Sequence, residues 1–195
     1  MTNHLVLLGD SVFDNGVYVK PGEADVTAHL VRKLGPSDWT LDMRAVDGHV
    51  ADSVKGQLRS KSVPMPCTFV LSVGGNDALG HLEEIPLLDL SDFHRIKEGF
   101  RVRYTKVLDL ILDHGQPLIV CTIYNPKFPE EDLQVIAEAG LSFFNDVITE
   151  EALRRNLSVI DLREVCSDPE AFANPIEPSE VGGDLITDVI IEHLA

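Results

Sequence analysis

Short apolar runs that end in small or polar turn residues recur along the chain, and amphipathic segments separate them. Apolar runs of this length are typical of strands, and apolar residues three or four apart are typical of helices. The predicted strands are 5–8, 39–46, 66–73, 118–123 and 157–162. The predicted helices are 23–34, 50–58, 130–156 and 181–194, with one more that Ser91 caps and Gly115 ends. This alternation favours a five-stranded parallel sheet covered on both faces, a three-layer α/β/α fold.

A length of 195 residues suits one domain, and we expect residues 1–195 to form it. No apolar run approaches the roughly 20 residues that span a bilayer. The chain enters its first strand without the basic and apolar regions of a signal peptide. Cys67 and Cys121 fall in apolar strand segments, which favours free thiols over disulfides. We therefore expect a cytoplasmic protein.

The charge of the chain excludes some partners. Aspartate and glutamate total 32 against 16 lysine and arginine residues, which gives a net charge of −16 at pH 7. The electrostatic field of such a negative charge repels nucleic acids and anionic lipids, so we expect neither as a partner. The cysteines and histidines are too widely spaced for a metal site. The first turn lacks the glycine pattern or lysine of a nucleotide site, so no cofactor is predicted and a flavin or nucleotide protein is disfavoured.

Three polar or flexible residues follow three different predicted strands. Ser11 comes after the first strand, Gly48 after the second and Asn76 after the third. Because parallel strands end at the same edge of a sheet, we expect these residues to meet there. A serine hydroxyl is a nucleophile, and a glycine N–H and an asparagine amide can stabilise an oxyanion. Together they predict acyl transfer.

The segments that carry these residues are Gly9-Asp10-Ser11, Gly48 and Gly74-Gly75-Asn76-Asp77, and a closing Pro178–Gly183 segment leads into the last helix. In order and spacing they resemble the sequence blocks of the SGNH, or GDSL-type, hydrolases. The resemblance implies a flavodoxin-like architecture and an esterase or lipase-like activity. It also implies that Ser11 is the nucleophile, and that Asn76 and the N–H groups of Ser11 and Gly48 form the oxyanion hole.

The last block departs from the family pattern. Where the family usually has Asp-x-x-His before Pro-Ser, this chain has Asn174-Pro175-Ile176-Glu177. The usual base and its orienting carboxylate are therefore both replaced.

His49 directly follows the oxyanion glycine, and we hypothesise that His49 is the general base and that Glu177 orients it or stabilises its charged form. In a variant of this hypothesis Glu177 is itself the base, which requires burial to raise its pKa. His81 lies a few residues beyond Asn76 and is a third candidate. A surface or capping role is the alternative for each histidine, and His29 and His193 are predicted to be surface residues.

Asp10, Tyr124 and Asn125 are candidate substrate-binding residues, although Asp10 can equally brace its own turn. The leading interpretation is a serine hydrolase that cleaves a carboxylic ester of a small molecule through an acyl-enzyme. The alternative is a weakly active or silent protein of the same fold that binds an acyl or carbohydrate-like ligand. Lipid, carbohydrate acetyl, thioester and peptidyl esters all remain candidate substrates.

Overall fold

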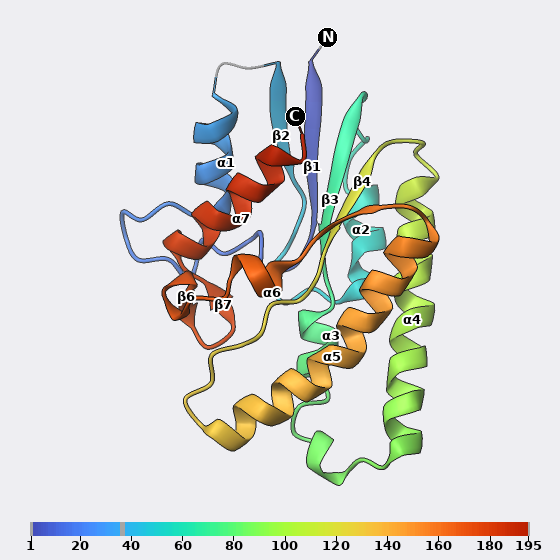
Figure 1. Cartoon of the computed structure of the whole chain (residues 1–195). Helices are drawn as coiled ribbons and strands as arrows, with labels where there is room; N and C mark the ends of the chain where they lie inside the picture. Colours follow the sequence, from blue (N-terminus) through green and yellow to red (C-terminus); the bar gives the residue numbers. More distant parts are fainter. Residues whose placement is uncertain (1, 36–37, 195) are drawn as a thin grey trace.

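Five parallel strands form the central sheet in the order β2-β1-β3-β4-β5 (Figure 1). The computed structural model describes residues 2–35 and 38–194. The strands are β1 (Asn3–Gly9), β2 (Trp39–Met43), β3 (Cys67–Ser72), β4 (Leu118–Cys121) and β5 (Ser158–Ile160). Each of the five lies at a predicted position, and every neighbouring pair is parallel, which confirms the predicted sheet.

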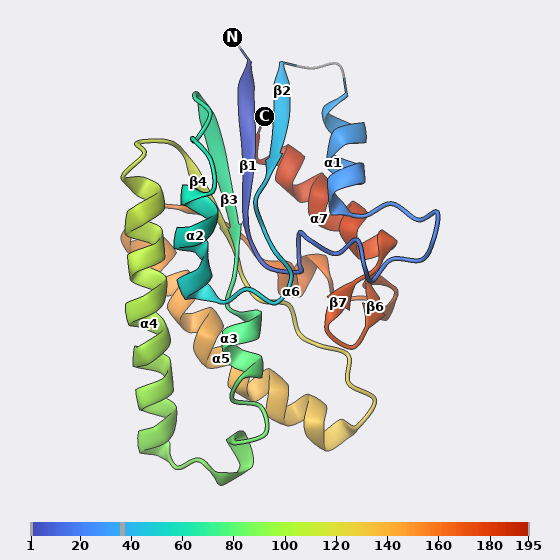
Figure 2. The ribbon, with the colours of Figure 1, turned by 180° about the vertical axis from the view of Figure 1, so that it is seen from behind.

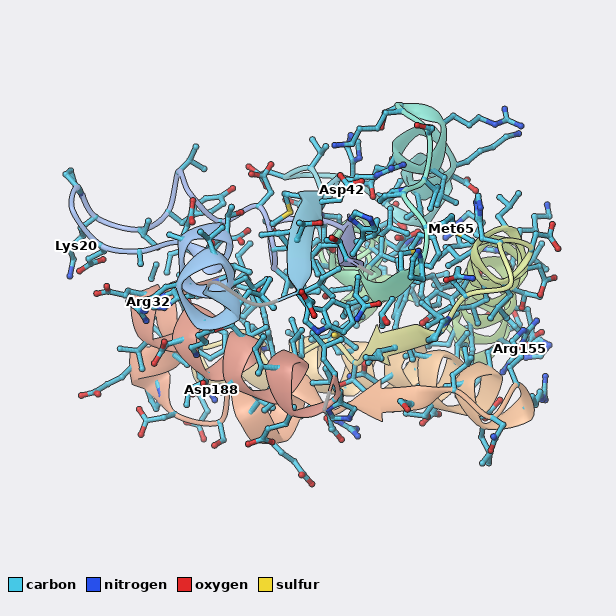
Figure 3. The ribbon with its side chains drawn as sticks, turned by 90° about the horizontal axis from the view of Figure 1, so that it is seen from above. Lys20, Arg32, Asp42, Met65, Arg155 and Asp188 are labelled. Carbon is cyan, nitrogen blue, oxygen red and sulfur yellow. The ribbon has the colours of Figure 1, made fainter. Side chains whose placement is uncertain are left out.

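Helices cover both faces of the sheet. The helices are α1 (Val26–Leu34), α2 (Val54–Arg59), α3 (Gly75–Leu79), α4 (Leu90–Leu112), α5 (Glu131–Arg154), α6 (Leu162–Val165) and α7 (Glu180–Glu192). Figures 1 and 2 show α2, α4 and α5 on one side of the sheet and α1 and α7 on the other. Viewed from above in Figure 3, Arg32 of α1 and Asp188 of α7 lie at one end of the molecule and Arg155 at the other.

The two faces of β1 illustrate why the sheet needs both layers. Val6 and Leu8 belong to the core cluster that includes α2, α4 and α5, whereas Leu5 and Leu7 belong to the cluster with α1 and α7. Successive side chains of a strand point to opposite faces, so a strand that is apolar at every position requires cover on both. The three-layer α/β/α architecture is thus confirmed.

Element ends differ from prediction where side chains cap a helix. The first helix begins at Val26 rather than residue 23, because Asp25 accepts a hydrogen bond from the Ala28 N–H. Asp89, not Ser91, caps α4: its side chain accepts from the N–H groups of Ser91 and Asp92. The expected cap at Ser91 is therefore wrong by two residues.

Shorter elements also depart from the predicted ranges. The predicted helix 50–58 begins as a 3-10 turn, η1 (Ala51–Ser53), before α2. A second 3-10 turn, η2 (Ile85–Leu87), lies in the segment between α3 and α4, and a third, η3 (Pro169–Ala171), precedes the last strands. The predicted loop 174–179 instead contains a small antiparallel hairpin, β6 (Phe172–Asn174) and β7 (Glu177–Pro178).

Gly9 allows the first strand to end against its neighbour. Its φ is +135°, and a Cβ placed there would lie 1.8 Å from the Ser72 carbonyl oxygen of β3. No other residue fits this position without moving the backbone. The turn that follows Gly9 is thereby held close to the carboxyl end of β3.

His29 is buried, contrary to the prediction of a surface residue. Its side chain is 2% exposed, and its Nδ1 lies 2.8 Å from Asp184 of α7. The α1 face that carries it packs on α7, so the helical spacing that was interpreted as solvent-facing is an interface. His193 is exposed, as predicted.

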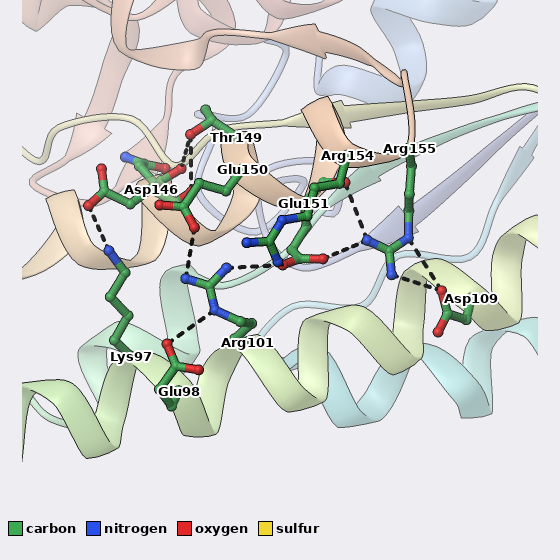
Figure 4. Close-up of polar contacts among 11 residues, drawn as sticks. Lys97, Glu98, Arg101, Asp109, Asp146, Thr149, Glu150, Glu151, Arg154 and Arg155 are labelled. Carbon is green, nitrogen blue, oxygen red and sulfur yellow. Dashed lines mark hydrogen bonds and ion pairs between the residues drawn. The ribbon is translucent and has the colours of Figure 1, made fainter.

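A network of charged residues joins α4 to α5 (Figure 4). Glu151 of α5 is buried and pairs with Arg101 of α4 and with Arg154 and Arg155. The Arg101 pair links the two helices, whereas the other two pairs lie within α5 and its C-terminal end. Arg155 also reaches Asp109 of α4 at 3.0 Å.

All three cysteines, at positions 67, 121 and 166, are buried free thiols. Among the residues that the structure describes, no helix combines the length and apolar character needed to cross a membrane.

Candidate active site

A pocket opens at the carboxyl edge of the sheet. One side of it is lined by Ser11, Asn76, Tyr124 and Glu177, and the other by apolar side chains of the segment from α3 to η2 and of α4 and α5. We call this the edge pocket. It holds about 930 Å³ of space, counted out to its open mouth. Residues that lie far apart in the sequence thus meet where the parallel strands end, as predicted for residues that follow the strands of a parallel sheet.

Ser11 sits in a tight turn directly after β1. The N–H groups of Phe13 and Asp14 both donate to the Asp10 carbonyl, and the Val12 N–H donates to the Asp10 carboxylate at 3.2 Å. These bonds fix the backbone on both sides of Ser11. Its side chain is therefore presented to the edge pocket on a rigid turn.

Asp10 lines the edge pocket but is almost fully buried. Burial raises the pKa of its carboxyl to about 8; the Val12 N–H opposes this shift, and the negative charges of Glu177 and Asp77 add to it. Its hydrogen bond to Val12 supports the turn-bracing role. A direct contact with substrate stays a prediction.

Asn76 lines the edge pocket, whereas Gly48 is not among its lining residues, so the oxyanion hole stays a prediction. Asn76 lies in the first turn of α3, in the wall of the edge pocket, and its amide donates a hydrogen bond to the His49 carbonyl at 3.0 Å. An amide has two N–H donors, so one remains for a substrate. Gly48 has a φ of +76°, which suits glycine, and its turn is exposed beside Asn76. Within residues 2–35 and 38–194, the N–H groups of Ser11 and Gly48 donate no hydrogen bond.

Four hydrogen bonds hold the backbone around Glu177. The Asn174 side chain accepts from the N–H groups of Ile176 and Glu177, at 2.9 and 3.0 Å. Tyr124 donates its hydroxyl to the Ile176 carbonyl at 2.6 Å, and Asn15 donates to the Pro178 carbonyl at 3.1 Å. Asn174 therefore braces the β6–β7 turn, and does not orient a base through its side chain.

The Glu177 carboxyl is buried and lies within hydrogen-bonding reach of the Ser11 side chain. Burial raises its pKa to about 7; hydrogen bonding by the Ser11 side chain lowers it, and the charge of Asp47 raises it. Its Oε2 atom is buried and has no hydrogen-bond partner among the described residues. A carboxyl group with a pKa near neutrality, beside a serine hydroxyl, has the basicity of an ordinary histidine.

His49 faces a different partner. Its Nδ1 accepts a hydrogen bond from the Gln57 amide at 2.9 Å, and the same Gln57 exchanges two hydrogen bonds with the backbone of Gly9. Because the Gly9 bonds fix the orientation of the amide, Nδ1 is an acceptor and the neutral ring carries its proton on Nε2. His49 is not among the residues that line the edge pocket. The shared action of His49 and Glu177 stays a prediction.

The remaining candidates divide between the pocket and its surroundings. His81 lines the edge pocket and lies 3.4 Å from Glu84. Tyr124 also lines it, but its hydroxyl is committed to the Ile176 carbonyl, and burial raises its pKa well above the usual value. Asn125 is half-buried and is not one of the lining residues, and its role in substrate binding stays a prediction.

Gln57 and Asn15 are site residues that the sequence did not reveal. Gln57 links His49 to the end of β1, and Asn15, fully buried, joins the loop after β1 to the Pro178 carbonyl and to the Val26 N–H. Neither belongs to a recognisable motif. Only the position of Asn15 in a polar loop after the nucleophile hinted at a role.

No group of three histidine, cysteine, aspartate or glutamate side chains within the described ranges is arranged to hold a metal ion. The polar groups that line the edge pocket are hydroxyls, one side-chain amide, one imidazole and two carboxyls, from Ser11, Ser72, Tyr124, Asn76, His81, Asp10 and Glu177.

The fold and these residues define a three-layer α/β/α protein with a serine that directly follows its first strand, at the carboxyl edge of the sheet. The family model of the GDSL-like lipase/acylhydrolase family matches residues 7–182, and the chain belongs to this family. A search of curated proteins found no match.

Solved structures of similar fold cover nearly the whole chain. An extracellular lipase from Streptomyces rimosus has a TM-score of 0.75 at 15% identity, with 98% of this chain and 99% of that one covered. A phospholipase A1 from Streptomyces albidoflavus gives 0.74 at 15% identity, with coverage of 98% and 99%. A catalytic mutant of an acetylxylan esterase from Geobacillus stearothermophilus gives 0.69 at 15% identity, with coverage of 100% and 96%. At 15% sequence identity, these comparisons show that the folds are similar and do not by themselves show a shared substrate.

Proposed function

We propose that the protein is a serine hydrolase that cleaves a carboxylic ester of a small molecule through an acyl-enzyme on Ser11, with Glu177 as the general base. Ester hydrolysis is the activity that the family generally carries. The observation that supports the base is the Glu177 carboxyl itself, which is buried beside Ser11, has a pKa of about 7 and keeps an unpartnered oxygen.

In the first half of the reaction the Ser11 oxygen attacks the ester carbonyl and its proton passes to Glu177. The negative charge on the former carbonyl oxygen is stabilised by the Asn76 amide and the N–H groups of Ser11 and Gly48. The C–O bond to the alcohol then breaks, and Glu177 returns the proton to the leaving oxygen. In the second half, Glu177 takes a proton from water, water attacks the acyl-enzyme, and the acid and the free Ser11 hydroxyl are released.

The role of Asn174 also favours Glu177 as the base. A histidine base usually needs a carboxylate to orient it. Here the replacement residue holds the backbone of Glu177, so the segment positions this carboxyl directly. In this proposal His49 positions Asn76 and does not act as the base. Its carbonyl accepts a hydrogen bond from the Asn76 amide, and its ring is hydrogen-bonded to Gln57.

Single substitutions test the proposal with short-chain p-nitrophenyl esters as substrates. We expect Ser11→Ala to lower kcat by at least about 1,000-fold and Glu177→Gln by roughly 100-fold to 10,000-fold, which is the contribution of a positioned general base. His49→Ala should keep kcat within about tenfold of wild type. Ser72→Ala is the matched control, because Ser72 also lines the edge pocket and should retain activity.

The opposite pattern has a clear meaning. Full loss in His49→Ala with activity retained in Glu177→Gln would make His49 the base. Equal loss in both would support the shared arrangement. A wild-type protein without turnover on any ester, folded by circular dichroism, would be the silent member of the family, and the hydrolase proposal would be wrong.

A further inference from the structure

The edge pocket is polar at one end only. Apart from Ser11 and its neighbours, His81 is the one lining residue with an ionisable side chain among those described, and it lies beside Glu84. The rest of the wall is apolar and comes from the α3–η2 segment, α4 and α5. It includes Leu82, Ile85, Phe93, Ile96, Ala137 and Phe143.

The apolar wall extends away from the sheet. Phe100 packs against the end of β3, where a Cβ on Gly74 would lie 3.0 Å from its ring. Phe93 precedes Phe100 by two turns of α4, so it lies roughly 10 Å further along the helix axis. Figures 1 and 2 show that α4 runs beside the sheet and continues well past its carboxyl edge.

Aromatic pairs join α4 and α5 at both levels. The rings of Phe100 and Phe144 are 4.8 Å apart, and those of Phe93 and Phe143 are 5.2 Å apart. The two helices are also held by the charged network of Glu151 (Figure 4). The apolar wall is thus a fixed feature between two braced helices.

We infer that the edge pocket takes the acyl part of the ester and is built for an unbranched fatty acyl chain of medium length, such as octanoyl. This inference rests on the proposed function, because Ser11 sets where the carbonyl carbon lies. With the carbonyl at Ser11, the acyl chain extends along the apolar wall toward Phe93 and Phe143, and the alcohol part leaves through the open mouth.

The chemistry of the wall discriminates between acyl groups. An acetyl group would leave the apolar wall in contact with water, whereas each methylene moved onto such a wall strengthens binding by about fourfold. If a carbohydrate ester bound the other way round, its sugar would lie on the apolar wall and lose hydrogen bonds to water without replacement, because the wall offers it almost no donors or acceptors. The site therefore favours a fatty ester over a carbohydrate acetyl ester.

A chain-length series tests the inference. We expect kcat/KM on p-nitrophenyl esters to rise at least about 100-fold from acetyl to octanoyl. It should fall again for palmitoyl, because that chain is longer than the apolar wall. Acetylated xylan should be a poor substrate. A flat series, or a maximum at acetyl, would overturn the inference while leaving the hydrolase proposal intact.

Two alanines of α5 provide a matched pair of variants. Ala137 is buried and lines the edge pocket, whereas Ala139 is exposed on the same helix. Ala137→Leu should lower kcat/KM for the octanoyl ester at least about tenfold and leave the acetyl ester within about twofold. Ala139→Leu should change neither. Retained acetyl activity shows that the variant is folded, and Ala137→Val is the smaller change if Ala137→Leu does not fold.

Binding to the inactive variant separates this inference from the proposed function. Isothermal titration of octanamide, a neutral analogue, into Ser11→Ala should give saturable binding that Ala137→Leu weakens in the same background and Ala139→Leu does not. If the wild type hydrolyses no ester but octanamide binds in this pattern, the acyl site stands and the hydrolase proposal fails. Absence of binding, together with a flat chain-length series, would remove the acyl site.

Discussion

The surroundings of Glu177, and not its residue type alone, make its carboxylate basic enough to act at neutral pH. An exposed glutamate is a weak base at neutral pH, but burial raises the pKa of Glu177 to about 7, and the nearby charge of Asp47 adds to the shift. Hydrogen bonding by Ser11 opposes it. The base form is the ionised carboxylate, so activity must increase as the pH rises through the pKa.

We therefore expect kcat/KM to climb with a midpoint near pH 7 and to stay level above it. Asp47→Asn should move this midpoint to lower pH, because it removes a negative charge that favours the protonated form. Asp52→Asn, an exposed change of the same kind, should leave the midpoint in place. The profile is measured on the octanoyl ester. If His49→Ala abolishes the acidic limb while activity remains, the titrating group is His49 and not Glu177.

The residues at the sheet edge were predictable to different degrees. Ser11 and Asn76 follow strands directly, so the topology alone places them together. Glu177 was found because it replaces an expected residue. The pairing of His49 with Gln57 was not predictable, because it depends on how α2 packs against the end of β1. The spacing of apolar residues in the sequence does not indicate this packing.

At the scale of elements, α4 and α5 do more than cover the sheet. They form the apolar wall of the edge pocket, and Glu151 at their interface pairs with three arginines while being almost fully buried. These partners hold the pKa of the Glu151 carboxyl below its usual value even though burial alone would raise it. Removing the carboxylate leaves their guanidinium groups unpaired.

We expect Glu151→Gln to destabilise the fold by about 2 kcal/mol, which corresponds to a fall in Tm of roughly 4–8 °C for a chain of this size. Glu150→Gln is the matched control. Glu150 is more exposed and, among the described residues, pairs with Arg101 alone, so its loss should cost under about 1 kcal/mol. Thermal unfolding by circular dichroism measures both. Equal effects in the two variants would mean that burial of Glu151 adds nothing to the network.

Element prediction succeeded for long periodic segments and failed for short ones. The five strands and the long helices follow from apolar spacing, and most of their ends differ from the predicted ones by one to three residues, among them the helix starts that Asp25 and Asp89 cap. The β6–β7 hairpin escaped prediction because its strands have two or three residues and one of them contains Pro178. Such pairing is set by tertiary contacts, among them the bond from Asn15, and not by local preference.

At the scale of the whole molecule, charge becomes a determinant of substrate choice. The net charge is −16, and the edge pocket has Asp10 and Glu177 among its lining residues but no lysine or arginine among those described. A negatively charged ester therefore approaches a negative surface, and as the pH rises above about 7 it also meets the ionised Glu177 carboxylate in the pocket. A neutral ester meets no such barrier, in keeping with an apolar acyl site.

The matched pair of p-nitrophenyl butyrate and p-nitrophenyl hemisuccinate tests this, since the two acyl groups are similar in length and differ in charge. At low salt we expect kcat/KM for the hemisuccinate to be at least about tenfold below that for the butyrate. Raising the salt from roughly 0.01 M to 1 M shortens the screening length from about 30 Å to about 3 Å, so the hemisuccinate value should rise severalfold while the butyrate value stays within about twofold. A hemisuccinate rate that falls with salt would instead reveal attraction, and would require a cationic group near the pocket mouth that outweighs the charge of the molecule.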